Sequence, residues 1–244
     1  MVKDRSLPRR LFCYQRIDPY GHTLDIFRNK QIWFSKPSDF NDPFDCRIYP
    51  DKISANYIAD KAPESSFSRD FTREMLKNNL SDEKALEFIR VAIDNVISEK
   101  GIKCFTPYPD NLLMWSHYAD SHKGICIEFD VLEDPEFFIF PIKVKYEKEY
   151  PKIDFTNVAE TVKIYSTKSI EWSYEEEIRV MKLKTGLHDI KPSAIRSIII
   201  GCKTPQSDID KIIDILSSEE SLGHIVLKKA IPDEYAFRLN IIDL

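Results

Sequence analysis

The sequence predicts an α+β fold whose core is a mixed or antiparallel split sheet. Three patterns lead to this expectation. Short segments in which apolar and polar residues alternate, as in strands, recur along the chain. A longer stretch with helical spacing predicts a helical insertion at about residues 50–100, and the end of the chain reads as a C-terminal β-α-β-β unit. No linker, repeat or low-complexity segment divides the sequence, so we expect a single domain over residues 1–244.

The first elements are short. Leu11–Ile17 alternates as a first strand, 23–30 is a plausible helix, and Gln31–Ser35 is a second strand. The segment Pro37–Asp45 (PSDFNDPFD) is rich in Asn, Asp and Pro, which favours a turn. The polar side chains of this turn can bind a ligand or a cation, or they can cap backbone groups and pair with an arginine.

The clearest helical pattern begins at Ser81, and Gly101 is placed to end it. Its apolar residues fall three and four apart, at Ala85, Phe88, Ile89, Ala92, Ile93 and Val96. Lys103–Thr106 then reads as a strand that leads into the most informative stretch of the chain.

That stretch is Asp110–Asp130, in which aromatic and polar residues are unusually dense. Asp110 or Asn111 can cap a helix over 111–123, and Gly124 is placed to end it in the left-handed conformation. The alternating run after Gly124 predicts a strand with one buried face.

Side chains on the predicted helix divide between two faces. His117 and Ser121 are four residues apart and share one face, whereas Trp115, Tyr118 and His122 follow a spacing of three and four on another. The two histidines therefore do not converge on one metal ion. The simpler alternative is a helix–strand corner in which Trp115 and Tyr118 are core residues and His117 is structural.

A second concentration of polar residues follows at Glu171–Leu183. If a strand begins at Glu175, the side chains of Glu175, Glu177 and Arg179 project to one face, and the guanidinium keeps Glu177 ionised and oriented. The alternative is a solvated edge strand with cross-strand ion pairs.

Six further elements complete the expected fold. IKVKY at 142–146 reads as a strand, and 151–170 has helical character. Ile195–Gly201, the helix Ser207–Leu216 and the strands His224–Ala230 and Tyr235–Ile242 make the β-α-β-β unit.

Composition excludes several classes of protein. The net charge of −5 gives no global field for nucleic acid. The six glycines form neither GxGxxG nor GxxxxGK[ST], so a bound nucleotide has to be held by side chains. The five cysteines lack CxxC spacing, which favours reduced thiols in the core. With no signal-peptide pattern and no long apolar run, we expect a cytoplasmic protein without membrane contact.

With these motifs in place, the chain resembles an uncharacterised bacterial family, a domain of unknown function. The shared features are an aromatic first strand, WFS followed by FNDPFD, CFT followed by MWSHYADSHKGICIEF, a late W-x-Y-E-x-E-x-R and IIIG. The segments that match are Leu11–Ser35, Phe40–Asp45, Cys104–Asp130, Trp172–Arg179 and Ile198–Gly201.

A looser similarity is to the mono-ADP-ribosyltransferase fold. It rests on a first strand with Tyr14 and Arg16, a short helix, a strand ending in Ser35 and a late Glu175 or Glu177, although the Ser-Thr-Ser motif is missing. The resemblance implies a split sheet that holds NAD without a glycine loop and a glutamate beside the ribosyl centre. Enzymes of this kind include toxins and phage-defence effectors that act on nucleic acid or protein targets.

The resemblance and the two polar stretches together give the candidate residues. Catalytic candidates are Glu177, Arg16 and His117; candidates for holding NAD are Tyr14, Ser35, Trp115, Tyr118, Lys123 and Arg179; candidates for a substrate or turn site are Asn41, Asp42, Asp45, Ser121 and His122. No metal-ligating set is assigned.

Three functions are consistent with these residues. The first is an NAD-using ADP-ribosyltransferase-like enzyme, in which Glu177 acts electrostatically. The second is a metal-dependent nuclease or phosphohydrolase with Asp42, Asp45, Glu128 and Glu177 as oxygen ligands. The third is a non-enzymatic module of a defence system that binds a nucleotide or a partner protein.

Overall fold

The computed structural model describes residues 7–18, 22–47, 91, 94–95, 97–153 and 158–244. Most of the predicted helical insertion, including the six apolar residues named for its pattern, lies outside these residues. Its final turn is described: Ile97 and Ser98 are helical and the helix has ended before Gly101, as predicted.

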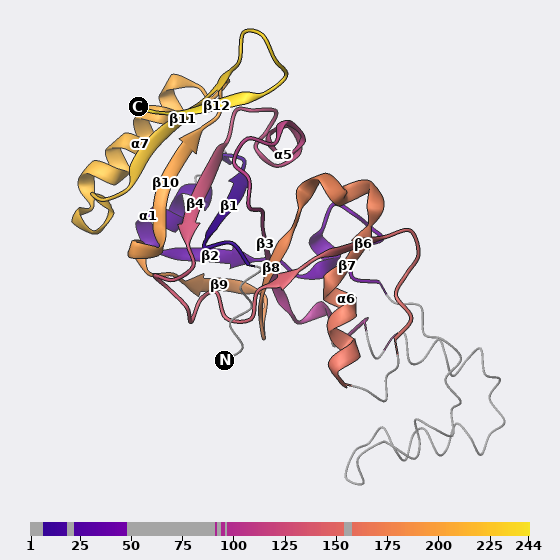
Figure 1. The fold of residues 1–244 in the computed structure, drawn as a ribbon. Coiled ribbons are helices and arrows are strands. Elements are labelled where there is room, and N and C mark those ends of the chain that lie inside the picture. The colour runs from indigo at the N-terminus through magenta and orange to yellow at the C-terminus, as the bar shows by residue number, and fades with distance from the viewer. Residues whose placement is uncertain (1–6, 19–21, 48–90, 92–93, 96, 154–157) are drawn as a thin grey trace, which may run out of the picture.

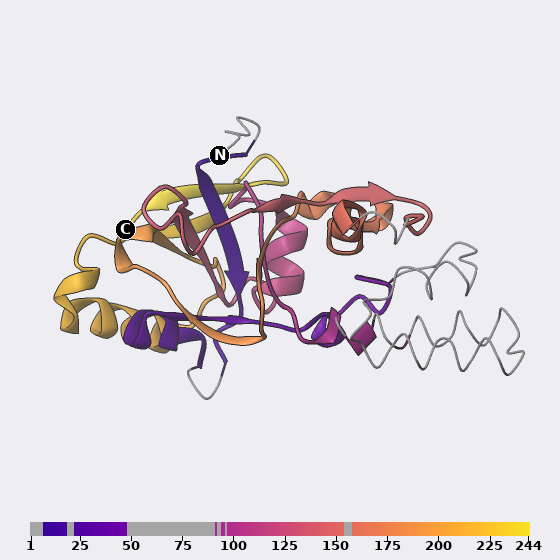
Figure 2. The ribbon, with the colours of Figure 1, turned by 90° about the horizontal axis from the view of Figure 1, so that it is seen from below.

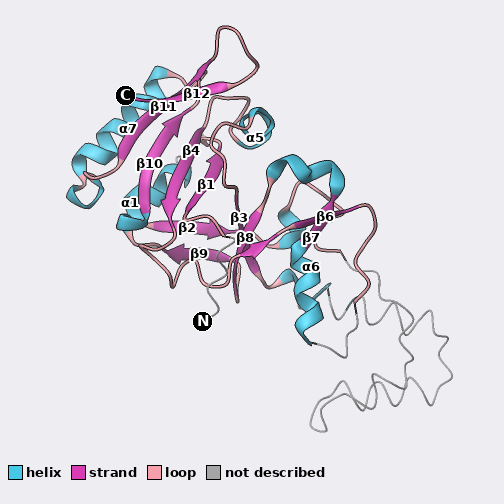
Figure 3. Ribbon diagram, in the orientation of Figure 1, coloured by secondary structure: helices cyan, strands magenta, loops and turns pink. Residues whose placement is uncertain are grey.

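The α+β prediction is confirmed, and the strands form separate mixed and antiparallel sheets (Figures 1 and 3). The largest sheet has five strands in the order β1-β4-β10-β11-β12. Its members are β1 (Arg10–Gln15), β4 (Ile125–Asp130), β10 (Ile195–Ile200), β11 (Val226–Pro232) and β12 (Leu239–Asp243).

Three smaller sheets complete the described part of the fold. Strands β3 (Gly101–Phe105), β8 (Ile178–Lys182) and β5 (Ile142–Lys143) form an antiparallel sheet with β8 in the middle. Two further pairs are antiparallel β2 (Gln31–Phe34) with β9 (Gly186–Asp189), and parallel β6 (Lys145–Glu147) with β7 (Thr167–Ser169).

The predicted C-terminal β-α-β-β unit is present. Helix α7 (Gln206–Ser218) connects β10 to its parallel neighbour β11, and β12 returns antiparallel to β11. The buried side chains of α7 are Ile209, Ile212 and Ile215, so its apolar stripe packs on the sheet.

Both faces of the five-stranded sheet are covered. One face packs against α7 and α1 (Asp25–Asn29), and the other against α5 (Leu112–Tyr118), as Figure 2 shows. Trp115 of α5 is fully buried and meets the ring of Tyr14 edge to face at 5.2 Å. The expectation of one buried face on β4 is therefore wrong, because Cys126 and Asp130 on the opposite face are also buried.

The turn between α5 and β4 differs from the prediction. The helix ends at Tyr118 rather than 123, and three consecutive residues, Asp120, Ser121 and His122, have the positive φ values expected of Gly124. Gly124 serves another purpose: a Cβ there would lie 2.2 Å from the carbonyl oxygen of Gln15 on β1. Close backbone approach, not a left-handed cap, therefore requires this glycine.

Two bridges join the sheets. Phe12 of β1 and Thr106 exchange backbone hydrogen bonds of 2.8 and 2.9 Å, and Ser35 and Ile102 exchange bonds of 3.1 and 2.8 Å. The edges of β1, β2 and β3 therefore converge near one place, and that place is where the polar residues gather.

Other expected elements are adjusted in their bounds. The predicted 142–146 strand is two short strands, β5 and β6, which belong to different sheets. Within 151–170, helix occurs as η3 (Val158–Thr161) and α6 (Val162–Ser166), and strands β7 and β9 are additions that the alternation pattern did not indicate. No helix in the described parts of the chain is long and apolar enough to cross a membrane.

Candidate functional site

A cluster of five charged side chains lies where β8, β7 and the FNDPFD turn meet. We call it the buried ionic cluster, and its members are Asp45, Lys168, Glu175, Glu177 and Arg179. Each is at most 7% exposed. Charged side chains buried to this degree require partners, so the geometry of the pairs decides what the cluster can do.

Arg179 is the centre of the cluster. Its Nε and Nη2 donate to the two carboxylate oxygens of Glu177 at 2.7 and 3.1 Å, and its Nη1 and Nη2 donate to Asp45 at 2.9 and 2.5 Å. Nη1 also donates to the Tyr165 carbonyl at 3.0 Å. The planar guanidinium thus joins the FNDPFD turn to β8 through two forked contacts.

Lys168, from β7, supplies the second positive charge. Its Nζ lies 2.5 Å from Glu175 Oε2, 3.3 Å from Glu177 Oε2 and 3.7 Å from Asp45 Oδ2. Burial opposes the charge of this ammonium, but the carboxylates of Glu177, Glu175 and Asp45 outweigh burial and raise the pKa of Lys168. The lysine is therefore protonated.

The pKa values of the two glutamates in the cluster are displaced in opposite directions. Burial disfavours the charge of both. For Glu177 the charges of Arg179 and Lys168 more than compensate, and they hold its pKa below the ordinary range. For Glu175 burial dominates over the attraction of Lys168, and the repulsion from Glu177 adds to it, so the pKa of Glu175 is raised. Two carboxylates with pKa values pushed apart can divide acid–base and electrostatic roles.

Helix α5 places Tyr118 over Glu175. The side chain of Asn111 caps the helix by accepting from the backbone N–H groups of Leu113 and Met114, and its amide donates to the carbonyl of Tyr174 at 2.6 Å. The Tyr118 hydroxyl donates to Glu175 Oε1 at 2.5 Å. Of the two predicted caps, Asn111 is therefore the one used, and it ties α5 to the segment that carries Glu175.

The Tyr118 hydroxyl also accepts a hydrogen bond from the amide of Asn41, at 3.3 Å. The FNDPFD turn therefore reaches the site twice, through Asn41 and through Asp45. Burial raises the pKa of Tyr118, and the neighbouring charge of Glu175 raises it further, so the phenol remains protonated and acts as a donor to the carboxylate.

Glu175 and Glu177 open onto a cavity of about 170 Å³ whose other walls include Ser35, Lys103 and Tyr118. A larger cleft of about 950 Å³ shares Ser35, Phe40, Asn41, Lys103 and Tyr118 with it. We call the smaller space the inner cavity and the larger one the outer cleft. Their shared walls make them adjoining parts of one site, and the outer cleft has the size of a small-molecule site.

Two cations of this site have no acidic partner among the described residues. Lys103, on β3, lines both spaces, and Arg16, just after β1, lines the outer cleft. Neither takes part in any ion pair of the described chain, in contrast to Lys168 and Arg179. Unpaired cations beside a cleft attract an anionic ligand such as a phosphate group.

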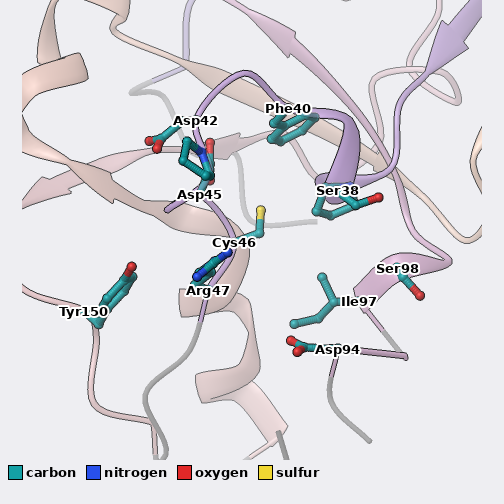
Figure 4. Close-up of a pocket in the computed structure, with 12 residues that line it drawn as sticks. Ser38, Phe40, Asp42, Asp45, Cys46, Arg47, Asp94, Ile97, Ser98 and Tyr150 are labelled. Atoms are coloured by element: carbon teal, nitrogen blue, oxygen red, sulfur yellow. The ribbon is translucent and has the colours of Figure 1, made fainter. Parts of the chain in front are cut away.

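A further cavity of about 730 Å³ is lined by residues of the FNDPFD turn, among them Asp42, and by Cys46, Asp94 and Tyr150 (Figure 4). Asp42 accepts from the Phe44 N–H at 2.9 Å, which makes it a turn-capping residue. The walls of this cavity flank residues 48–90, which lie outside the described chain, so we place the candidate chemistry in the outer cleft and inner cavity.

Several candidate residues from the central stretch do not line the outer cleft or the inner cavity. Trp115 is fully buried and cannot stack on a ligand. The His122 ring stacks in parallel on Trp115 at 6.2 Å, and its Nε2 is 3.2 Å from Ser116 Oγ. Ser121 and Lys123 are exposed and line neither the outer cleft nor the inner cavity.

Other candidates do reach the site. His117 lines the outer cleft, and its Nδ1 is 2.9 Å from the hydroxyl of Tyr174. Tyr14 lines the inner cavity, but its hydroxyl is occupied, donating to the Tyr108 carbonyl at 2.8 Å and accepting from the Asn111 N–H at 3.2 Å. Ser35 lines both the inner cavity and the outer cleft, and its backbone joins β2 to β3.

The late acidic segment departs from its prediction in one respect. Strand β8 begins at Ile178, and Glu175 instead ends a 3-10 helix, η4 (Ile170–Glu175). Glu175, Glu177 and Arg179 nevertheless meet in one cluster, as the alternation pattern indicated. The alternative of a solvated edge strand is wrong, because β8 is central in its sheet and these side chains are buried.

Sequence reasoning missed Lys168 and Lys103. Both lie in short segments whose polar residues give no spacing signal. Lys168 meets its carboxylates only because β7 pairs with β6, and Lys103 enters the site because β3 is joined to β2. The only available hint was a lysine within a few residues of the W-x-Y-E-x-E-x-R motif.

The carboxylates proposed as metal ligands do not converge. Glu128 lies in the five-stranded sheet, where Ser197 donates to it at 2.5 Å, while Asp45 and Glu177 both bind Arg179. Among the described residues there is no group of three or more His, Cys, Asp or Glu side chains arranged to hold a metal ion.

Comparison with known protein families finds a match to part of the chain. A family described as a protein of unknown function (DUF2971) matches residues 114–180, a span that includes Tyr118, Lys168, Glu175 and Glu177. This match supports the similarity to an uncharacterised domain-of-unknown-function family. No curated protein and no solved structure matches the chain.

Proposed function

We propose that this protein is an NAD-using enzyme of the ADP-ribosyltransferase type. The observation that carries the proposal is that a buried carboxylate, Glu175, and two cations without an ion-pair partner among the described residues, Arg16 and Lys103, line adjoining parts of one site. A pyrophosphate would contact the cations, and the ribose that bears nicotinamide would lie towards the inner cavity. The acceptor would be a nucleic acid or a protein, as for a toxin or phage-defence effector.

The reaction needs few catalytic groups from the protein. The bond between ribose C1′ and the nicotinamide nitrogen breaks, nicotinamide leaves with the bonding electrons, and the acceptor forms a bond to C1′ and loses a proton. Positive charge develops on the ribose, and a fixed carboxylate in a buried site stabilises that charge. Glu175 is buried and oriented by Tyr118 and Lys168, which suits this role.

We assign this role to Glu175 rather than to Glu177. Both oxygens of Glu177 accept from Arg179, so moving them towards a substrate would remove one of the two carboxylates that pair with this buried guanidinium. Glu175 is held by Tyr118 and Lys168, of which Tyr118 lines both parts of the site. Glu177 then acts as a positioning residue that fixes Arg179 and Lys168.

A second candidate is a non-enzymatic module that binds a nucleotide. The observation that favours it is that both oxygens of Glu175 have partners within the protein, as expected for a cluster kept only for stability. Both candidates use the same cleft, so they differ in turnover and not in ligand.

The test is nicotinamide release from NAD, measured with cell extract as a source of acceptor. Wild type is compared with Glu175→Gln and with the matched control Glu176→Gln, whose side chain is exposed and outside the site. We expect Glu175→Gln to lower the rate about 100-fold or more, as for loss of one electrostatic catalytic group. Glu176→Gln should behave as wild type.

Folding of each variant is checked by near-ultraviolet circular dichroism. A folded Glu175→Gln protein that releases nicotinamide at the wild-type rate would remove Glu175 from the reaction. A folded wild type that binds NAD and releases no nicotinamide would favour the binding module.

A further inference from the structure

Trp33 is the most exposed tryptophan of the described chain and faces the outer cleft. Along β2 its neighbours Ile32 and Phe34 are buried at 2% and 0% exposure, whereas Trp33 is 52% exposed. The strand therefore fixes the backbone on both sides of a large aromatic side chain that is left open to solvent. The exposure follows from strand alternation and not from a loose end.

The surroundings of Trp33 are those of a ligand site. Leu187, its cross-strand partner on β9, is 55% exposed and lines the same cleft. Asn29 and Gln15 bring amide groups to the cleft, and Arg16 brings the unpaired cation. Small-molecule sites combine such apolar and aromatic walls with a few polar groups.

We infer that Trp33 is a stacking platform for the base of a nucleotide ligand, with Leu187 beside it. A planar heterocycle fits this position because its face packs on the indole, while amides such as Asn29 can bond its edge. The phosphate groups would then extend past Arg16 towards Lys103.

The position of Trp33 also indicates which of the two ring systems of NAD, adenine or nicotinamide, stacks on it. Trp33 lines the outer cleft but not the inner cavity, and Glu175 lines the inner cavity but not the outer cleft. The ribose that reacts lies beside Glu175, so the base over Trp33 is adenine, at the other end of NAD. This assignment of the two ends rests on the proposed function, whereas the stacking on Trp33 does not.

The experiment measures binding of ADP-ribose and of inorganic pyrophosphate to the folded, full-length protein by calorimetry. Trp33→Ala should weaken ADP-ribose binding about tenfold or more, in the range for loss of one stacked base, and should change pyrophosphate binding less than about twofold. Trp33→Phe should restore most of the affinity. Tyr235→Ala is the matched control, because Tyr235 is 93% exposed and outside the cleft.

The binding experiment tests the stacking inference, and together with the nicotinamide-release assay it distinguishes failure of the inference from failure of the proposed function. Equal ADP-ribose affinity in wild type and Trp33→Ala would overturn the inference, and so would equal weakening of both ligands or no binding of ADP-ribose by wild type. If ADP-ribose binding depends on Trp33 but wild type releases no nicotinamide from NAD, the inference stands and the proposed enzyme activity fails.

Discussion

Arg179 shows how one residue can fix a site without touching a ligand. It is fully buried and binds two carboxylates from distant parts of the sequence, Asp45 and Glu177. The charges cost free energy to bury, and the arrangement holds because every one is paired. Such a residue supports the catalytic candidate Glu175 indirectly, since Lys168 contacts Glu175, Glu177 and Asp45 together.

Removal of the guanidinium should therefore be severe. We expect Arg179→Met to lower the free energy of unfolding by about 3–5 kcal/mol, because it leaves two buried carboxylates without their main partner. The measurement is urea unfolding at neutral pH. The matched control is Arg28→Met, which removes a half-exposed arginine paired at i,i+3 with Asp25 and should cost less than about 1 kcal/mol. Equal losses in the two variants would contradict the role assigned to the cluster.

The low pKa of Glu177 gives the stability of the protein a pH dependence of known sign. Because the pKa is lowered in the folded state, the contribution of Glu177 is fully present above its unfolded pKa of about 4.3. It is lost as the pH falls through the folded pKa. We expect Glu177→Gln to be less stable than wild type at pH 7 and to show a shallower loss of unfolding free energy between about pH 5 and pH 3. Parallel curves for the two proteins would contradict this.

At the scale of elements, α5 and the turn that follows it decide where Tyr118 lies. Asn111 fixes the start of the helix, and the turn at 119–124 fixes its end against β1 and the loop after β10. The backbone carbonyl of Gly124 accepts from the N–H of Gly201 at 3.0 Å and from the Thr204 hydroxyl at 2.9 Å. The turn is thus held from two sides.

Gly124→Ala tests this packing. Its Cβ would meet the carbonyl oxygen of Gln15 at 2.2 Å and the Cα of Ala119 at 3.0 Å, and both are backbone atoms that cannot move aside cheaply. We expect a loss of about 3 kcal/mol in unfolding free energy, measured by urea unfolding. Gly223→Ala is the control, because its nearest neighbour is 3.5 Å away and its φ of −61° suits alanine. A Gly124→Ala protein as stable as this control would show that the approach to β1 is loose.

At the scale of the whole molecule, the site lies where sheets meet and not within any one of them. The five-stranded sheet contributes Tyr14 to the inner cavity and Gln15 to the outer cleft, β2 contributes Trp33, and β3 contributes Lys103. The cluster comes from β7, β8 and the FNDPFD turn. A ligand in the outer cleft would therefore contact three sheets.

The sequence by itself determined the α+β class, the C-terminal β-α-β-β unit and the proximity of Glu175, Glu177 and Arg179, because these depend on local periodicity and on residues close together in the chain. For the FNDPFD turn it left two alternatives open, a site for a ligand or cation, or side chains that cap the backbone and pair with an arginine. Only the tertiary structure decided that Arg179 is that arginine, that Trp115 is core while Trp33 faces the cleft, and that Lys168 and Lys103 join the site. The physical reason is that these contacts depend on which strands pair across long separations, as with Arg179 and Asp45, and a periodic pattern within one segment carries no information about its partner.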